Sequence, residues 1–466
     1  MAPSALDLLV LTLNCAKELI NVGIFAKHLQ TALLKEGGGS TLPDVVVFSL
    51  QEVAPLGYSF VGGYFLNPYL ARFEDAVNLA ALNILDDQRA ADVVSVTQTQ
   101  PVDRPKKPYS IVKSGNVGYT AIVLLARNPD QIKDVQEAEI GFGAADMGNK
   151  GAVGLRMLFE ADNGQETQVT FVATHLAAME WNLARRNANW ASIVRGLTFG
   201  NPEDVVAKAR RPSSSSAEDN GETRSLLHDE NHHARLQKEL HAISIFRPSS
   251  HLFVAGDLNY RISTTSPPVG ASFPSLDPDS EHHYMHFWHL DQLTREKAAG
   301  RTLHGLSEVK VTFPPTYKYV VKAKGKDDEA PNWSFAPHRY PSWTDRVLYL
   351  DTPSSADHKV DVKGYDALPV IASSDHRAVY LRASVPLLSP GDMEGSLSAE
   401  SDDPRVKLPL EIDPEAWERR AAARRKEVMV GWGMMIGTTW EGVLALGTLL
   451  AVGVGWYWYT TSNARP

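Results

Sequence analysis

Short runs of apolar and β-branched residues recur along most of the chain and predict buried strands. These runs are Leu6–Leu13, Val45–Leu50, Gly118–Ala126, Gly151–Phe159, Gln168–Thr174, Leu252–Ala255 and Val347–Leu350. Longer mixed segments predict helices at Pro68–Leu85, Glu180–Leu197, Ala234–Phe246 and Phe287–Ala299. Strands and helices mixed in this way indicate an α/β fold whose sheets are covered by helices.

The most apolar stretch lies at the C-terminus. From Val428 to Tyr459 the only charged residue is Glu441, and the stretch ends in the aromatic run Trp456–Tyr459. A membrane span needs about 20 mostly apolar residues, and aromatic residues gather at its interfaces. The basic cluster Arg419–Lys426 precedes it, which by the positive-inside rule predicts a tail anchor with the body in the cytosol. A buried core helix is the alternative, and the terminal position, the glycines and the arginines disfavour it.

Polar segments divide the rest of the chain. Pro386–Pro414 is rich in Pro, Ser, Asp and Glu and predicts a linker. Arg211–His233 and Thr264–His282 predict surface insertions. The expected organisation is a catalytic domain at residues 1–385, a polar linker with the basic juxtamembrane cluster at 386–427, and a membrane anchor at 428–459.

Composition narrows the function classes. The 466 residues carry a formal net charge of −9, which argues against a protein that binds nucleic acid over its whole surface. A local basic pocket is still compatible with an acidic protein. The single cysteine, Cys15, excludes an internal disulfide and fits a reducing cytosolic setting. Residues Met1–Thr12 have no basic residues before their short apolar run, so they predict a first buried strand and not a signal peptide.

Candidate chemistry lies where the predicted strands end. Asn14, Glu52 and His175 each close or follow a strand, Asp257 and Asn259 follow another, and Asp375 and His376 precede one. Loops at one edge of a rigid sheet are where α/β proteins place their sites. A lone Gln-Glu or Gly-Asp is usually a turn, and a lone His-Leu is usually a core histidine. The co-occurrence of these pieces at strand ends favours a shared site.

The residue types fit hydrolysis of a phosphate ester. Mg²⁺ prefers oxygen ligands, which Glu52, Asn14 and Asp375 supply. An attacking water must be aimed and activated, for which Asp257 is suited. Charge on the phosphate needs hydrogen-bond donors, and the candidates are Asn149, Asn259, His175 and His376.

Longer motifs make the chain recognisable. In chain order they are MGNKGAV at Met147–Val153, GDLNYR at Gly256–Arg261, FPPTYKY at Phe313–Tyr319, PSWTDRV at Pro341–Val347 and SDHR at Ser374–Arg377. Over roughly Leu6–Leu381 the sequence resembles the inositol polyphosphate 5-phosphatases. The resemblance implies a DNase I-like (endonuclease/exonuclease/phosphatase) fold, in which two mixed sheets pack together with helices outside.

The resemblance also implies roles at the reacting phosphate. Glu52 is the main magnesium ligand with Asn14 beside it, and Asp257 activates the attacking water, which Asn259 helps to hold. His376 contacts the scissile phosphate and is paired with Asp345, which fixes its tautomer.

The same resemblance assigns substrate contacts. Asn149 and His175 touch the scissile phosphate, whereas Tyr317, Lys318 and Arg339 are expected to bind the neighbouring 4-phosphate through charge-assisted bonds.

The expected activity is removal of the 5-phosphate from phosphatidylinositol 4,5-bisphosphate in a membrane. The tail anchor makes the chain most similar to fungal members held on the endoplasmic reticulum with the catalytic domain facing the cytosol. A sphingomyelinase-like or nuclease-like hydrolase of the same fold is one alternative, but it does not need the FPPTYKY segment. A catalytically dead lipid-binding module is another, which the intact acidic residues disfavour. The sequence implies neither a nucleic-acid ligand nor any partner protein.

Overall fold

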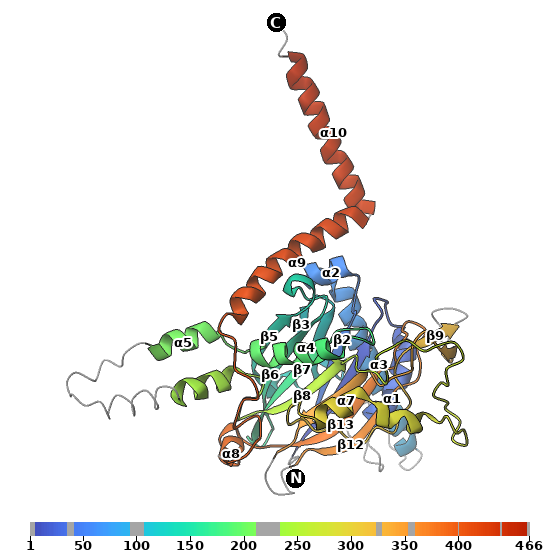
Figure 1. Ribbon diagram of the computed structural model, residues 1–466, viewed down its shortest axis with the longest axis vertical. Helices are drawn as coiled ribbons and strands as arrows, with labels where there is room; N and C mark the ends of the chain where they lie inside the picture. The colour runs from blue at the N-terminus through green and yellow to red at the C-terminus, as the bar shows by residue number, and fades with distance from the viewer. Residues whose placement is uncertain are drawn as a thin grey trace, which may run out of the picture.

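The computed structural model describes residues 5–34, 42–93, 107–210, 234–322, 329–352, 359–398, 400–438 and 440–463. Within these ranges two β-sheets pack face to face, and helices cover their outer faces (Figure 1). The predicted two-sheet α/β architecture is confirmed. The predicted insertion Arg211–His233 lies outside the described residues.

The first sheet has six strands in the order β12-β13-β1-β2-β4-β3. The strands are β1 (Ala5–Asn14), β2 (Val45–Gln51), β3 (Ser110–Val117), β4 (Thr120–Ala126), β12 (Asp361–Ala367) and β13 (Val379–Pro386). β1 and β2 run parallel, and the other neighbours are antiparallel.

The second sheet has five strands in the order β11-β8-β7-β6-β5. The strands are β5 (Ile132–Gly141), β6 (Gly151–Glu160), β7 (Glu166–His175), β8 (His251–Asp257) and β11 (Asp345–Leu350). Here β7 and β8 form the parallel pair. A separate two-stranded ribbon joins β9 (Tyr319–Lys322) to β10 (Asn332–Phe335).

The central strands are mostly apolar because both of their faces are buried. In β1, Leu8 and Val10 pack in the core between the sheets, while Leu9 and Leu11 pack beneath the helices on the outer face. Alternation of side chains along a strand produces this division. The hydroxyl of Ser49 donates to the carbonyl of Ala255 at 2.9 Å and links the two sheets directly.

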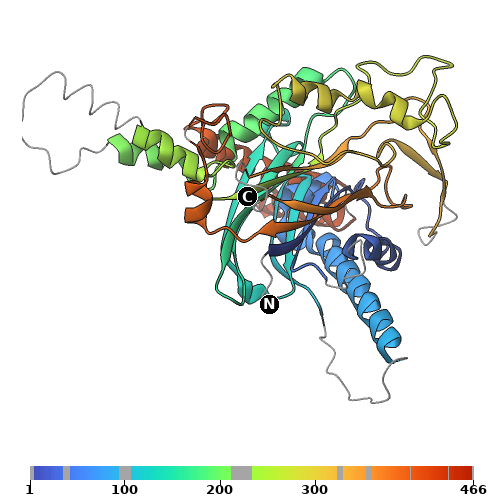
Figure 2. The same ribbon diagram turned by 90° about the horizontal axis from the view of Figure 1, so that it is seen from below.

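Helices α1 (Val22–Leu33) and α3 (Asn67–Val93) cover the first sheet and lie together on one side of the body (Figure 2). Helices α4 (Leu183–Gly196) and α7 (Gln292–Ala298) cover the second sheet. The side chain of Asn21 starts α1 by accepting the backbone N–H of Ile24 at 3.0 Å. The remaining elements are α2 (Leu56–Val61), α5 (Pro202–Arg210), α8 (Pro390–Gly395), α9 (Ala416–Thr438), α10 (Trp440–Asn463), and the 3-10 turns η1 (Gly63–Phe65), η2 (Pro129–Gln131), η3 (Ala144–Asp146) and η4 (Tyr284–Leu290).

The helix predicted at Phe287–Ala299 is in fact two elements, η4 and α7, separated at Asp291. The buried carboxylate of Asp291 accepts the N–H of Thr294 at 2.9 Å, which caps α7, and pairs with Arg346 at 3.1 Å. A cap residue has non-helical backbone angles, so the continuous helix is interrupted there.

The segment expected to be an extended polar linker is instead packed on the body. Met393 in α8 is fully buried, and Arg405 is 1 % exposed. The Arg405 guanidinium donates to the Asp351 carbonyl at 2.5 Å and pairs with Asp403 at 2.7 Å. A composition rich in Pro, Ser and Asp therefore does not make this segment a free tether.

Helix α9 runs across the expected boundary between residues 427 and 428. Helix α9 lies along the body beside α2, and α10 projects away from it (Figure 1). Within the described residues one segment, Gly442–Ser462, is long and apolar enough to cross a membrane, with a mean hydropathy of 1.4.

Acid should weaken the fold through His251, the first residue of β8. This histidine is fully buried, and its Nε2–H donates to the carbonyl of Pro386 at 3.3 Å. Burial, together with the charge of Arg405, lowers its pKa to about 3. The unfolded chain takes up this proton below pH 6.5 and the folded chain does not. The free energy of unfolding should therefore fall by about 1.4 kcal/mol per pH unit between pH 6.5 and about 3.

Urea unfolding of His251→Gln at several pH values measures this contribution, because glutamine can donate the same hydrogen bond but does not titrate. The slope of stability against pH should be shallower in this variant, and His282→Gln on the surface serves as the control. Equal slopes for wild type and His251→Gln would show that His251 is not the acid-sensitive group.

Candidate active site

The two parallel strand pairs place their polar ends at the same edge of the sandwich. The register pairs Asn14 with Gln51 across β1 and β2, so Glu52 follows beside Asn14. It pairs His175 with Asp257 across β7 and β8, and antiparallel β11 places Asp345 opposite Asp257. Because carboxyl ends of parallel strands share one edge, residues far apart in sequence meet there.

The loop that carries SDHR is tied to this edge by one serine. The Ser374 hydroxyl donates to the carbonyl of Asn14 at 2.6 Å and accepts the N–H of His376 at 3.0 Å. These two bonds fix His376 beside the end of β1.

A cavity of about 300 Å³ opens at this edge. Its lining includes most of the residues predicted from the sequence, namely Asn14, Glu52, His175, Asp257, Asn259, Tyr317, Lys318, Asp375 and His376. It also includes residues that the sequence did not single out, namely Ala16, Lys17, Lys150, Ala178 and Arg261.

Asp257 is the buried carboxylate at the centre of the cavity. Its Oδ2 lies 3.1 Å from Asn14 Nδ2, 3.3 Å from His175 Nε2 and 4.0 Å from His376 Nε2. Burial alone raises the pKa of a carboxyl group, but the hydrogen bond from His175 and the charge of His376 lower the pKa of Asp257 below its usual range. Asp257 is therefore a carboxylate at neutral pH and can accept a proton or a hydrogen bond from water.

The two histidines differ in charge. Burial and the nearby Lys150 lower the pKa of His175, whose Nε2 lies within hydrogen-bond reach of both Lys150 Nζ and Asp257. By contrast, His376 Nδ1–H donates to Asp345 Oδ2 at 2.9 Å. Burial lowers the pKa of His376, but Asp345 outweighs that effect and raises it to about 9. At neutral pH His376 is a cation and His175 is neutral.

Asp345 is fixed behind His376 and does not line the cavity. Its Oδ2 also accepts the hydroxyls of Thr316 at 2.7 Å and Thr344 at 2.8 Å. Three donors on one oxygen hold the carboxylate still. The predicted pairing of Asp345 with His376 is present in the structure.

Two further carboxylates line the cavity, each beside a lysine. Glu52 Oε2 lies 2.9 Å from Lys17 Nζ, and Asp375 Oδ2 lies 2.5 Å from Lys318 Nζ. Glu52 has a φ of 45°, a left-handed conformation that is uncommon for a residue with a side chain. Such strain persists where the surrounding structure imposes it, often at functional sites.

The donor set suits a hard divalent cation. Asn14, Glu52, Asp257 and Asp375 line one cavity and carry side-chain oxygens, the ligands that Mg²⁺ and Ca²⁺ prefer, although Asn14 Oδ1 already accepts the N–H of Ala16 at 3.0 Å. Among the described residues, Asp257, Asp345 and His376 also offer ligand atoms within 4.8 Å of one another. Asp345 is the weakest member because His376 and two threonines already occupy its Oδ2.

The structure gives two predicted substrate residues other contacts. Asn149 Oδ1 accepts the N–H of Ala144 at 3.2 Å and so shapes its own loop. Arg339 pairs with Glu180 at 3.2 Å. Neither residue belongs to the cavity lining.

Sequence reasoning missed the cations Lys17, Lys150 and Arg261, although each lies within three residues of a predicted site residue. Surface lysines next to turns are usually solvated, so their charge alone gave no signal. In the structure the Arg261 guanidinium lies 4.3 Å from the Tyr317 ring and bonds the Asn259 side chain. With Lys318 and His376, these groups make the cavity suited to a multiply charged anion.

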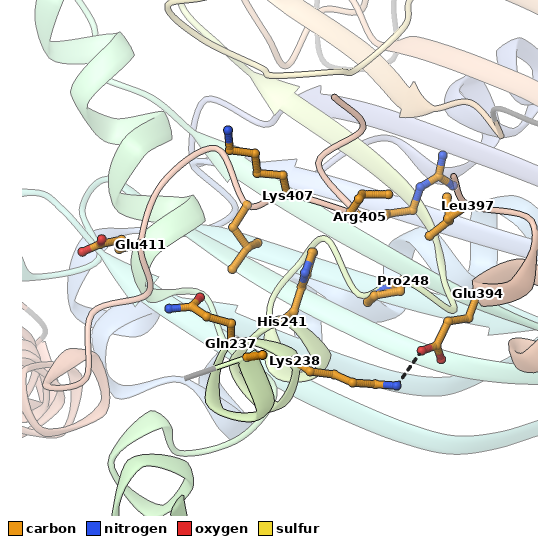
Figure 3. A pocket seen from close by; sticks show the side chains of 12 residues that line it. Gln237, Lys238, His241, Pro248, Glu394, Leu397, Arg405, Lys407 and Glu411 are labelled. Carbon is orange, nitrogen blue, oxygen red and sulfur yellow. Dashed lines mark ion pairs between the residues drawn. The ribbon is translucent and has the colours of Figure 1, made fainter. Parts of the chain in front are cut away.

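A larger cavity of about 530 Å³ lies elsewhere, between the helix at residues 234–243 and the segment 394–411 (Figure 3). Lys238 pairs with Glu394 at 3.0 Å, and His241 Nε2 donates to the carbonyl of Pro404 at 2.9 Å. These polar groups thus bind partners within the cavity wall, and the lining shares no residue with the cavity at the strand ends.

Comparison with known proteins identifies the family and relatives of this chain. Residues 11–382 match the family described as Endonuclease/Exonuclease/phosphatase family 2. A type II inositol polyphosphate 5-phosphatase of Arabidopsis thaliana is 31 % identical over 53 % of this chain, which covers 20 % of that protein. A polyphosphatidylinositol phosphatase of Saccharomyces cerevisiae is 28 % identical over 72 % of this chain and 23 % of its own length. The chain thus spans about a fifth of the length of these curated relatives.

One solved structure shares the fold. The inositol polyphosphate 5-phosphatase domain of a synaptojanin, bound to inositol (1,4)-bisphosphate and calcium, superposes with a TM-score of 0.52 and 22 % identity. The similarity covers 82 % of this chain and 84 % of that domain.

The Asp345–His376 pair gives a direct test of the site electrostatics. Replacing Asp345 by Asn keeps the shape but removes the charge that raises the pKa of His376. Burial then weighs more heavily against the cation while Asp257 and Asp375 still favour it, so this pKa should fall clearly below about 9. A ¹⁵N-imidazole NMR titration of the metal-free protein measures it, with thermal unfolding as the check on folding. A pKa that stays near 9 in folded Asp345→Asn would contradict this account.

Proposed function

Because the chain belongs to endonuclease/exonuclease/phosphatase family 2, in which it is similar to inositol polyphosphate 5-phosphatases, we propose that it hydrolyses the 5-phosphate of phosphatidylinositol 4,5-bisphosphate. One observation carries the proposal: a buried carboxylate, Asp257, lies between a neutral and a cationic histidine in a cavity rimmed by cations. Such a cavity combines a group that can activate water with groups that can stabilise a phosphate.

The proposed mechanism assigns one task to each group. Asp257 orients the attacking water and accepts its proton, and Asn259 helps to hold that water. The His376 cation donates Nε2–H to the phosphate, where negative charge builds up in the transition state. Asp345 keeps that proton on His376 by holding Nδ1–H. Lys150 supplies a further donor beside the same phosphate, and His175 is proposed to turn its Nε2–H from Asp257 to that phosphate.

A divalent cation, proposed to be Mg²⁺, fits the oxygen donors Glu52, Asn14 and Asp375. When bound, it would supply Lewis-acid stabilisation of phosphoryl oxygens. For this to occur, Lys17 and Lys318 must release part of their pairing with Glu52 and Asp375. That exchange lets Lys318 turn to the substrate.

The rim of the cavity is proposed to bind the neighbouring 4-phosphate. Lys318 and Tyr317 lie side by side at the cavity mouth, with Lys318 Nζ 5.3 Å from the Tyr317 ring. Asn149 and Arg339 remain proposed substrate contacts. To bind substrate, they would exchange their present partners, Ala144 and Glu180, for the phosphate groups.

The membrane setting is also a proposal. Gly442–Ser462 has the length and composition of a span. We propose that it anchors the protein in the endoplasmic reticulum membrane with residues 1–385 as a cytosolic catalytic domain. A lipid headgroup in that membrane would then be the substrate.

Phosphate release should require a divalent cation and the central carboxylate. We expect Glu52→Gln and Asp257→Asn each to lower kcat by about 10²–10³ or more on a dispersed short-chain phosphatidylinositol 4,5-bisphosphate. The matched control is Glu160→Gln, which removes an exposed carboxylate at the end of β6. Full turnover by dialysed protein in excess chelator would exclude the metal-dependent mechanism, and no release from any inositol phosphate would exclude the phosphatase.

Lys318 should discriminate among substrates. Lys318→Ala should reduce kcat/KM for substrates with a 4-phosphate by more than for those without one, because one charge-assisted contact is lost. Lys322→Ala is the control, because this exposed lysine ends β9, the short strand that directly follows Lys318. Parallel losses on both substrate classes would show that Lys318 does not bind the 4-phosphate.

A further inference from the structure

The helix that leads to the candidate membrane span is packed against loops of the active site. Helix α9 lies beside α2 (Figure 1). Ala423 and Glu427 lie on the side of α9 that faces the body, and both are buried. The neighbouring Arg425 and Lys426 are exposed. The helix therefore has one face on the body and one face in solvent.

Glu427 is the centre of this contact and is fully buried. Its Oε1 accepts the backbone N–H of Gly148 at 2.7 Å. Arg420 donates to both carboxylate oxygens of Glu427, at 2.5 and 2.9 Å, and also binds Glu139 at 2.9 Å. A buried charge persists only when it is paired and hydrogen-bonded, so this network holds α9 in one position.

Gly148 connects Glu427 to the active site through the backbone. It directly precedes Asn149 and Lys150, and Lys150 lines the cavity. The carbonyl of Gly148 accepts the N–H of Tyr119 at 3.1 Å, and the carbonyl of Tyr119 accepts the N–H of Val53 at 3.3 Å. Val53 follows Glu52. Hydrogen bonds and short backbone segments therefore link α9 to both Lys150 and the proposed metal ligand Glu52.

A second contact holds α2, the helix that begins four residues after Glu52. Gly57 and Gly431 let the two helices cross closely, and a Cβ on Gly431 would lie 2.9 Å from Phe60 Cβ and 3.0 Å from the Gly57 carbonyl. Arg424 donates to the carbonyl oxygens of Phe60 and of Val61, the latter at 3.0 Å. A cation at these last carbonyls stabilises the C-terminal end of α2.

We propose that α9 is a positioning element of the active site, in which Glu427 holds the Gly148 loop and Gly431 seats α2 behind Glu52. This inference rests on the proposed phosphatase function for its kinetic consequence. The segment next to the membrane anchor is then continuous with the catalytic body, and it acts on turnover through the backbone that carries Lys150 and Glu52.

The test uses the full-length chain in detergent with a dispersed short-chain phosphatidylinositol 4,5-bisphosphate. Glu427→Ala removes the acceptor of the Gly148 N–H, and we expect kcat to fall about 10- to 100-fold with a smaller change in KM, because catalytic groups are displaced. Glu427→Gln keeps an acceptor oxygen and should restore part of the loss. Arg425→Ala, on the exposed side of the same helix, should match wild type.

A matched glycine pair tests the second contact. Gly431→Leu inserts a side chain between α9 and α2, whereas a Cβ on Gly433 meets nothing within 4 Å. Gly431→Leu should therefore lower kcat, and Gly433→Leu should leave it unchanged.

Amide hydrogen exchange separates this proposal from the proposed function. Exchange at Gly148 and over residues 52–61 should speed up in Glu427→Ala while the core of β1 stays protected, and this readout needs no turnover. Wild-type protein that releases no phosphate but shows this exchange pattern would overturn only the phosphatase. If Glu427→Ala keeps the kcat and the exchange rates of the wild type, the positioning role is wrong. The positioning role is also wrong if kcat falls only together with a global loss of protection that includes β1.

Discussion

The whole site depends on compensating one buried carboxylate. Asp257 is 1 % exposed, and an isolated charge there would be costly. Asn14, His175 and His376 compensate it, and each comes from a different part of the chain. These partners converge only because two parallel strand pairs end at the same edge and because antiparallel β11 brings Asp345 up behind His376. The register of the sheets therefore sets the electrostatics of the cavity.

Much of this arrangement could be predicted from the sequence. Strands buried on both faces are continuous apolar runs, so β1, β2 and β8 were predictable, and a polar residue directly after such a run marks a sheet edge. Half-buried edge strands such as β5 and β12 lack that signal because exposed positions interrupt them. The break at Asp291 was hidden because a cap depends on a distant partner, Arg346.

The site was predictable where residue type and chemistry agree, as for Glu52, Asp257 and His376. It was not predictable where a residue's role depends on packing. In the sequence Lys150 and Arg261 look like ordinary surface cations, and only the fold places Lys150 near carboxylates and Arg261 over a ring in the cavity. Asn149 stays a predicted phosphate contact, and packing adds a second role, because its side-chain oxygen accepts a hydrogen bond within its own loop.

The basic cluster before the candidate membrane span shows why composition alone misleads. Counted as charges, Arg419–Lys426 predicts attraction to an anionic membrane surface. In the helix, however, Arg420, Arg424, Glu427 and Gly431 follow one another at intervals of four, three and four, which is the spacing of a single face. That face meets the body, where Arg420 and Arg424 bind buried acceptors, while Arg425 and Lys426 point to solvent. The cluster thus divides its charges: Arg419 pairs with Asp413, Arg420 and Arg424 face the body, and Arg425 and Lys426 face solvent. Periodicity is the sequence signal that distinguishes a docked helix from a polybasic tether.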